Sequence, residues 1–198
     1  MLFSRETQDF NLPDAQLTYL PSFLSKPEAD SLYEVLFNQT NWQHYDITVF
    51  GKTYPQPRLT ALYSVTNQPY SYSNITMHPS PLTDELKKLM SKVNDYTNHM
   101  FNTLLLNLYR DGSDSNGWHA DNEKELGINP VIASLSLGVE RPFHFKHRTL
   151  KEQRHKLLLQ HGSLLIMSGA MQHHWLHQIA KTKKSIGPRI NLTFRTLV

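Results

Sequence analysis

Histidine and aspartate residues that could bind a metal ion occur at two places in the sequence. His119 and Asp121 lie two residues apart in GWHADNEKELG, and His173, His174 and His177 lie close together in MQHHWLHQI. In an extended segment, residues i and i+2 point to the same side, so one imidazole and one carboxylate could approach the same ion. In a strand, His173 and His177 would share a face, and His174 would point away. Because the chain has 11 histidines, the alternative for His119 and Asp121 is an ordinary polar surface loop.

The C-terminal segment PRINLTFRTL alternates between polar and apolar residues. The polar positions share one face of a strand: Arg189, Asn191, Thr193 and Arg195. The apolar positions share the other: Ile190, Leu192 and Phe194. Arg189 and Arg195 would lie roughly 20 Å apart at the backbone. Arginine pairs bidentately with carboxylates, so the gap suits a small molecule with an anionic group at each end. The alternative is an exposed edge strand with scattered charge.

A second strand, TLLLNLYRDG, adds polar groups that could bind the same molecule. Asn107 and Tyr109 share a face, and could supply an amide and a phenol. The alternative is an ordinary half-buried strand. Taken together, a His-x-Asp pair, a later histidine and a dicarboxylate binder describe a facial triad of two histidines and one carboxylate for non-haem Fe(II).

Composition limits the kind of protein that carries these groups. The chain has 198 residues, 39% of them hydrophobic and none of them cysteine. This fits one globular domain without disulfides or thiolate metal ligands. No apolar run suits a transmembrane helix or a secretory signal, so we expect no membrane contact. The net charge of +3 and the pI of about 9.0 favour a polyanionic partner, although a solvated basic surface is the alternative.

The elements that must position these residues fall into two groups. A first helix is expected at 25–39, with Ser25 and Glu28 forming a capping box. A second is expected at 80–100, with Ser80 as cap. Its apolar stripe comprises Leu82, Leu86, Leu89, Val93, Tyr96 and Met100. From residue 103 onward, short apolar runs separated by turns predict a β-sandwich or jelly roll.

The order of these motifs resembles the AlkB family of Fe(II)/2-oxoglutarate dioxygenases. The resemblance rests on NLYRDGSDSNGWHADNE, ASLSLG, HGSLLIMSG, HHWLHQI and PRINLTFR, and so covers the C-terminal half. It is closest to the animal homologues that repair alkylated bases in duplex DNA, because VFGK, PRLTALYS and the pair Tyr70 and Tyr72 also match. It implies an α+β fold: a double-stranded β-helix (jelly-roll) core with the N-terminal helices packed on one sheet. Residues 1–198 would be a single domain, with 1–18 an N-terminal extension, 42–74 a nucleotide-recognition segment and 103–198 the core.

The resemblance also implies the cofactors and the reaction. Fe(II) would be held by His119, Asp121 and His177, the last chosen by its place after Trp175 and Leu176. The residues that would bind 2-oxoglutarate are Asn107, Tyr109, Arg189, Asn191 and Arg195. With O2, the reaction would be oxidative demethylation of bases such as 1-methyladenine and 3-methylcytosine, with release of formaldehyde. DNA is the preferred substrate, double- or single-stranded, and RNA is a further candidate.

Other residues match positions that contact nucleic acid in the family. Phe50 would sit at a hairpin tip and fill the gap left by a flipped base, or would instead pack under the turn. Tyr70 and Tyr72 would line the base pocket, or would be core residues. Glu123 matches an acidic residue that contacts the exocyclic amine. Two lysines of KTKK would contact phosphates, or would lie in a solvated loop: Lys183 and Lys184. A basic face would be extended by Arg141, Lys146, His147 and Arg148.

Two other functions remain open at this point. The same chemistry could act on tRNA, a protein or a small molecule. The chain could also be a nucleic-acid-binding protein with a degenerate metal site. We expect a cytoplasmic monomer, associated with the nucleoid in a bacterium or located in the nucleus in a eukaryote.

Overall fold

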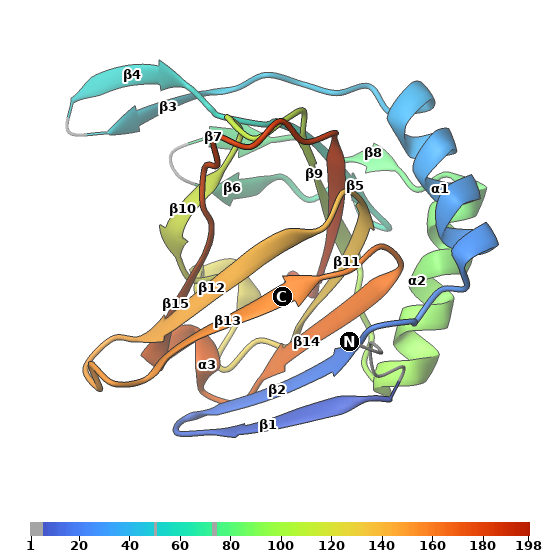
Figure 1. Cartoon of the computed structure of the whole chain (residues 1–198). Coiled ribbons are helices and arrows are strands. Elements are labelled where there is room, and N and C mark those ends of the chain that lie inside the picture. Colours follow the sequence, from blue (N-terminus) through green and yellow to red (C-terminus); the bar gives the residue numbers. More distant parts are fainter. Residues whose placement is uncertain (1–5, 50, 73–74) are drawn as a thin grey trace.

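The computed structural model describes residues 6–49, 51–72 and 75–198, and two facing β-sheets dominate them (Figure 1). Within these residues, the larger sheet has eight strands in the order β1 (Gln8–Leu12), β2 (Ala15–Leu20), β14 (Ser163–Ser168), β11 (Ile132–Gly138), β16 (Arg189–Arg195), β9 (Thr103–Tyr109), β5 (Leu59–Ser64) and β8 (Ser80–Pro81). The smaller sheet has four, in the order β10 (Asn116–His119), β15 (Trp175–Ile179), β12 (Arg141–His147) and β13 (Arg154–Leu159). Two hairpins stand apart from these sheets: β3 (Asp46–Val49) with β4 (Lys52–Pro55), and β6 (Tyr70–Tyr72) with β7 (Ile75–Met77).

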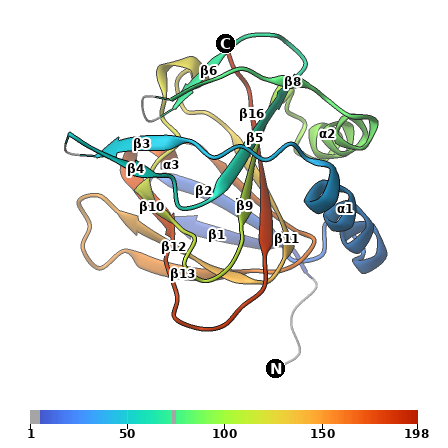
Figure 2. The same ribbon diagram turned by 90° about the horizontal axis from the view of Figure 1, so that it is seen from above.

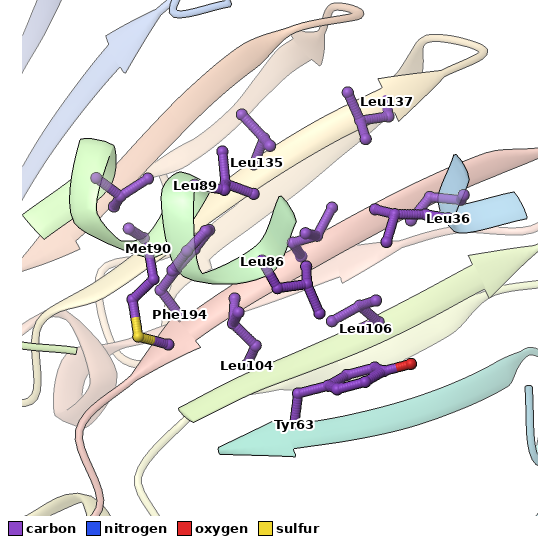
Figure 3. Close-up of a cluster of buried hydrophobic side chains, with 14 of the residues drawn as sticks. Leu36, Tyr63, Leu86, Leu89, Met90, Leu104, Leu106, Leu135, Leu137 and Phe194 are labelled. Atoms are coloured by element: carbon purple, nitrogen blue, oxygen red, sulfur yellow. The ribbon is translucent and has the colours of Figure 1, made fainter. Parts of the chain in front are cut away.

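Two helices cover the outer face of the larger sheet, as Figures 1 and 2 show from two directions. They are α1 (Lys26–Gln39) and α2 (Asp84–Thr97). Their buried side chains, among them Leu36 and Leu86, pack onto Leu104, Leu106 and Phe194 of the sheet (Figure 3). Burying a leucine in such a layer contributes about 1.5–3 kcal/mol. The predicted fold, with helices packed on one sheet of a jelly roll, is confirmed.

The alternation of β9 and β16 decides what lies between the two sheets. The leucines of β9 at even positions and the apolar residues of β16 face the helices. Leu105 and Tyr109 belong instead to a second buried cluster between the sheets, with Phe143, Phe145 and Trp175. The polar faces of β9 and β16 are therefore directed into the space between the sheets, as the alternation predicts.

The helix boundaries agree only in part with those predicted from the sequence. The capping box of α1 is present: the backbone N–H of Ser25 donates to the Glu28 carboxylate at 2.8 Å. The prediction for α2 was wrong at both ends, since Thr83 is its cap and Ser80 belongs to a strand. Asn98, in the left-handed conformation, ends the helix. Met100 lies beyond this end and is exposed, and Tyr96, although it is within the helix, is also exposed rather than part of the buried stripe.

Two segments differ from the expected domain layout. Residues 8–20, placed mostly in an N-terminal extension, form β1 and β2, and β2 pairs with β14 in the larger sheet. Leu59–Ser64, placed in the nucleotide-recognition segment, is β5 and pairs with β9. Both join the core because their apolar side chains complete its buried layers. None of the helices in the described ranges has the length and apolar character needed to cross a membrane.

Candidate active site

Three potential metal ligands meet where β10 and β15 lie side by side. His119, the last residue of β10, is the register partner of His177 in β15. Their Nε2 atoms are 3.1 Å apart, and His177 Nε2 is 3.8 Å from Asp121 Oδ2. With metal–nitrogen bonds of about 2.1 Å, two ligands at a right angle lie about 3 Å apart. The spacing therefore suits one shared ion.

The protonation of these groups suits a divalent cation. His119 Nδ1 donates to the carbonyl of Gly117 at 2.7 Å, so Nε2 carries no proton and can serve as a metal ligand, although the Asn116 amide nitrogen lies 3.1 Å from it. Burial lowers the pKa of His119, and burial together with the neighbouring His119 lowers the pKa of His177 to about 3. Burial would raise the pKa of Asp121, but the Arg195 guanidinium and the two histidines outweigh it and keep that pKa below its usual range. The site thus offers two neutral imidazoles and one carboxylate.

Asp121 is held by two side chains from distant segments. The Arg195 guanidinium forms an ion pair with Asp121 Oδ1. The backbone N–H of Asp121 donates to Gln172 Oε1 at 2.9 Å. All three residues are buried. Sequence reasoning gave Gln172 no role, because its position just before the histidine cluster carried no recognisable signal.

The other two histidines of MQHHWLHQI lie outside this site. Residues Met171–His174 form the short helix α3, so the strand alternation assumed for His173 and His174 does not apply, and both are exposed. His174 belongs to a second group of possible ligands, with Asp14 and His147. His147 Nδ1 accepts from the backbone N–H groups of Thr149 and Leu150, so its proton lies on Nε2 and points to Asp14. That tautomer makes a hydrogen bond rather than a metal bond.

The residues expected to bind 2-oxoglutarate lie opposite one another on β9 and β16. Arg189 is the register partner of Tyr109, and Asn191 is the partner of Asn107. One cavity between the sheets is lined by all of them and by the metal triad. The antiparallel pairing of β16 with β9 thus brings the two predicted polar faces to one place.

Arg189 is the clearest sign of an anionic ligand in this cavity. Its side chain is buried, and Nη2 donates to the Ser136 hydroxyl at 2.9 Å. Its Nε and Nη1 atoms have no hydrogen-bond partner among the residues that the structure describes. Burial lowers the pKa of Arg189 to about 10, so it still carries its charge at neutral pH. A buried cation with two unused donors matches a carboxylate ligand.

Arg58, which the sequence reasoning missed, arranges part of the same cavity. It is buried, and its Nε donates to Asn107 Oδ1 at 2.8 Å, which leaves the Asn107 amide N–H groups to face a ligand. The Asn191 amide is used differently: Nδ2 donates to Ser134 Oγ at 2.7 Å, and Oδ1 accepts from Thr193. Ligand binding by Asn191 stays a prediction. An arginine before an apolar strand was the only signal for Arg58.

Some of the residues expected to contact nucleic acid lie among the described residues, and others do not. Phe50 and the side chain of Tyr72 lie outside the described residues, although β3 and β4 form the expected hairpin on either side of Phe50. Tyr70 is buried, with its ring 5.3 Å from the Arg195 guanidinium. Burial raises the pKa of Glu123, and the positive charge of Arg195 opposes that shift. These two residues adjoin the metal triad.

The basic residues differ in exposure. Lys183 and Lys184 lie exposed in the loop between β15 and β16. Lys146 points outward from β12, whereas Arg141 and His147 are buried, so the expectation that these two extend a basic face was wrong. The reason is alternation along β12. Arg141 instead donates to the carbonyl groups of three loop residues: Asp111, Asp114 and Ala180.

Comparisons with known proteins agree with this geometry. A family profile described as the 2OG-Fe(II) oxygenase superfamily matches residues 16–195. Over 186 residues the chain is 45% identical to alpha-ketoglutarate-dependent dioxygenase alkB homolog 3 of Mus musculus, covering 89% of this chain and 64% of that protein. Over 183 residues it is 35% identical to DNA oxidative demethylase ALKBH2 of Homo sapiens, covering 87% of this chain and 70% of that protein. The chain belongs to the AlkB family.

A solved structure supports the fold of this AlkB-family chain. The structure of OsALKBH1 superposes with a TM-score of 0.65 at 17% identity, covering 96% of this chain and 100% of that one. Family membership implies Fe(II) and 2-oxoglutarate as cofactors. The residues present fit both cofactors. The triad offers a ligand set for a divalent metal ion, and Arg189 has two nitrogen donors without a hydrogen-bond partner among the described residues. The chain spans 64% of the length of its alkB homolog 3 relative from mouse.

Proposed function

We propose that this chain removes N-alkyl groups oxidatively from nucleic-acid bases such as 1-methyladenine and 3-methylcytosine. The observation that carries the proposal is the triad of His119, Asp121 and His177, of which Asp121 and His177 are buried. It lines one cavity with the Arg189 guanidinium, which has two nitrogen atoms without a hydrogen-bond partner among the described residues. DNA as substrate is supported by 35% identity over 87% of the chain to a human protein described as a DNA oxidative demethylase.

The residues of the chain have separate tasks in this reaction. The triad would hold Fe(II), while Arg189, Tyr109 and Asn107 would orient 2-oxoglutarate. The chemistry that bound Fe(II), 2-oxoglutarate and O2 would supply is hydroxylation of the N-methyl carbon, with succinate, CO2 and formaldehyde as products beside the restored base. Arg195 keeps Asp121 ionised, and the apolar side chains of Leu105, Phe143 and Ile179 limit water in the cavity.

A basic, aromatic surface next to the site supports a nucleic-acid substrate. Trp118 precedes His119 and is 41% exposed, with Lys146 Nζ 4.3 Å from its ring centre. The pocket around this pair contains no acidic residue from the described part of the chain, and it is lined by further basic residues: His144, Arg154, His155 and Lys156. Such a surface combines phosphate attraction with a ring for base stacking. We place the strand that flanks the flipped base here.

One assay tests the proposal directly. The chain is incubated with Fe(II), 2-oxoglutarate and an oligonucleotide containing 1-methyladenine, single-stranded or duplex, and formaldehyde and restored adenine are measured. Both should appear with the native chain and be absent with His177→Ala. Uncoupled conversion of 2-oxoglutarate to succinate without base restoration on either strand form would contradict the proposal, and would redirect it to a tRNA, protein or small-molecule substrate.

A second assay tests the surface. Lys146→Glu combined with Lys156→Glu should weaken binding of an unmodified oligonucleotide at least tenfold at low salt and reduce the salt dependence of binding. Affinity for 2-oxoglutarate should stay unchanged, because both residues point away from the cavity. Lys87→Glu combined with Lys88→Glu, on the exposed face of α2, is the charge-matched control. Equal weakening by both pairs would remove the surface from the proposal.

A further inference from the structure

Asp121 lies in a part of the backbone that no sheet holds in place. β10 ends at His119, and residues 120–123 belong to no strand or helix. The other two potential metal ligands sit in a strand ladder, as register partners in β10 and β15. The position of the carboxylate must therefore be set by contacts made by Asp121 itself.

The Gln172 side chain supplies a contact that sets this backbone. Its Oε1 atom accepts the backbone N–H of Asp121 at 2.9 Å, and its Nε2 atom lies 3.9 Å from Met167 Sδ in β14. The side chain is only 1% exposed. A buried amide of this kind is costly to leave without partners, so its conformation is restricted from both ends.

Gln172 also lies on the segment that leads directly to His177. It belongs to α3, and β15 follows immediately with His177 at its centre. The hydrogen bond thus ties the loop of Asp121 to the segment of His177 across 51 positions of the sequence. His177 Nε2 and Asp121 Oδ2 lie 3.8 Å apart, and Asp121 Oδ1 is also paired with the Arg195 guanidinium.

We propose that Gln172 is a positioning residue of the metal site, which holds Asp121 in register with His177 before the metal binds. The inference rests on the metal site formed by the triad. Outer partners of metal ligands typically change metal affinity by 10–100-fold when removed. If Gln172 were only a satisfied core amide, its loss would lower stability without a specific effect on the metal.

Metal binding by the apo protein tests this without turnover. Mn(II) or Co(II) affinity is measured by calorimetry for the native chain, Gln172→Met and Gln172→Glu. Gln172→Met keeps the size but removes the acceptor, and should weaken binding 10–100-fold. Gln172→Glu retains an acceptor for the Asp121 N–H, and should recover most of the affinity.

A remote destabilised variant separates positioning from stability. Met90→Ala leaves a cavity in the layer between α2 and the larger sheet, away from the triad. It should lower the melting temperature at least as much as Gln172→Met while changing metal affinity less than twofold. Native-like affinity in Gln172→Met, equal loss in Gln172→Glu, or equal loss in Met90→Ala would overturn the proposal. Failure of the native chain itself to bind either metal would instead refute the triad as a metal site.

Discussion

Replacing Arg189 by methionine should make the apo protein more stable and its binding of 2-oxoglutarate weaker. Arg189 is buried with two nitrogen atoms that have no hydrogen-bond partner among the described residues. Such a charge is costly to bury, and methionine fills a similar volume without it. The free energy of unfolding should therefore rise while the affinity for 2-oxoglutarate falls, as expected of a residue whose charge is compensated only by a bound anionic ligand.

The magnitude follows from the pKa of this guanidinium. Burial lowers the pKa of Arg189 from 12.5 to about 10, which at about 1.4 kcal/mol per unit is a penalty of roughly 3 kcal/mol. Because the folded-state pKa is the lower one, the penalty is present in full below about pH 10 and disappears only as the pH rises toward the unfolded value. Loss of the hydrogen bond to Ser136 costs about 1 kcal/mol. We expect a net gain of about 2 kcal/mol, or roughly 4–8 °C in melting temperature.

The loss of binding free energy for 2-oxoglutarate should be at least as large as the gain in the free energy of unfolding. Truncating one partner of a buried charge pair costs about 2–5 kcal/mol, so the Kd for 2-oxoglutarate should rise from about 30-fold to several thousand-fold. Urea unfolding and calorimetry with 2-oxoglutarate measure the two effects separately.

Arg141→Met is the matched control for this change. Arg141 is also a buried arginine facing Tyr109, but it donates to three backbone carbonyl groups. Its loss leaves those carbonyls without their donor and should destabilise the apo protein by about 3 kcal/mol or more. An Arg189→Met protein that is less stable than the native chain, yet binds 2-oxoglutarate within a fewfold of it, would refute the reasoning.

Three further changes have defined outcomes. Asp121→Ala should abolish Mn(II) binding in calorimetry and cost about 3–5 kcal/mol in urea unfolding, because it removes the carboxylate that faces the buried Arg195; a smaller loss than 1 kcal/mol would contradict this. Asp114→Asn should cost stability at neutral pH, because hydrogen bonds from Arg110 outweigh burial and lower the pKa of Asp114. That contribution is present above the unfolded pKa of about 3.9 and is lost as the pH falls through the lower folded value, so the difference in unfolding free energy should shrink below about pH 4. Gly112→Ala should displace the loop with Lys183 and Lys184, since its Cβ would lie 2.6 Å from the carbonyl oxygen of Thr182; oligonucleotide affinity should fall while 2-oxoglutarate affinity does not.

Local patterns in the sequence were sufficient for the strands that carry the site. Alternation along β9 and β16 correctly separated the face packed on the helices from the polar face. The capping box of α1 was equally readable, because Ser25 and Glu28 are neighbours in the chain. These features depend on interactions within a few residues, which the order of residues records directly.

Where local signals compete, the sequence was less informative. Ser80 and Thr83 can each cap a helix, and the pairing of Ser80 and Pro81 with β5 decided in favour of Thr83. His173 and His174 were expected to lie in a strand with His177, yet they belong to α3, in which Met171 and Gln172 are buried. Likewise, the N-terminal residues join the larger sheet through pairing with β14.

The sequence by itself determined which residue types could form an iron and dicarboxylate site, because a His-x-Asp pair, a later histidine and two arginines on one strand face occur together in it. Only the tertiary structure decided which side chains set their positions. Gln172 reaches Asp121 across 51 positions, and Arg58 reaches Asn107 across 49. Contacts of that kind depend on which strands pair and which loops meet, and nothing in the neighbourhood of either residue along the chain records the outcome.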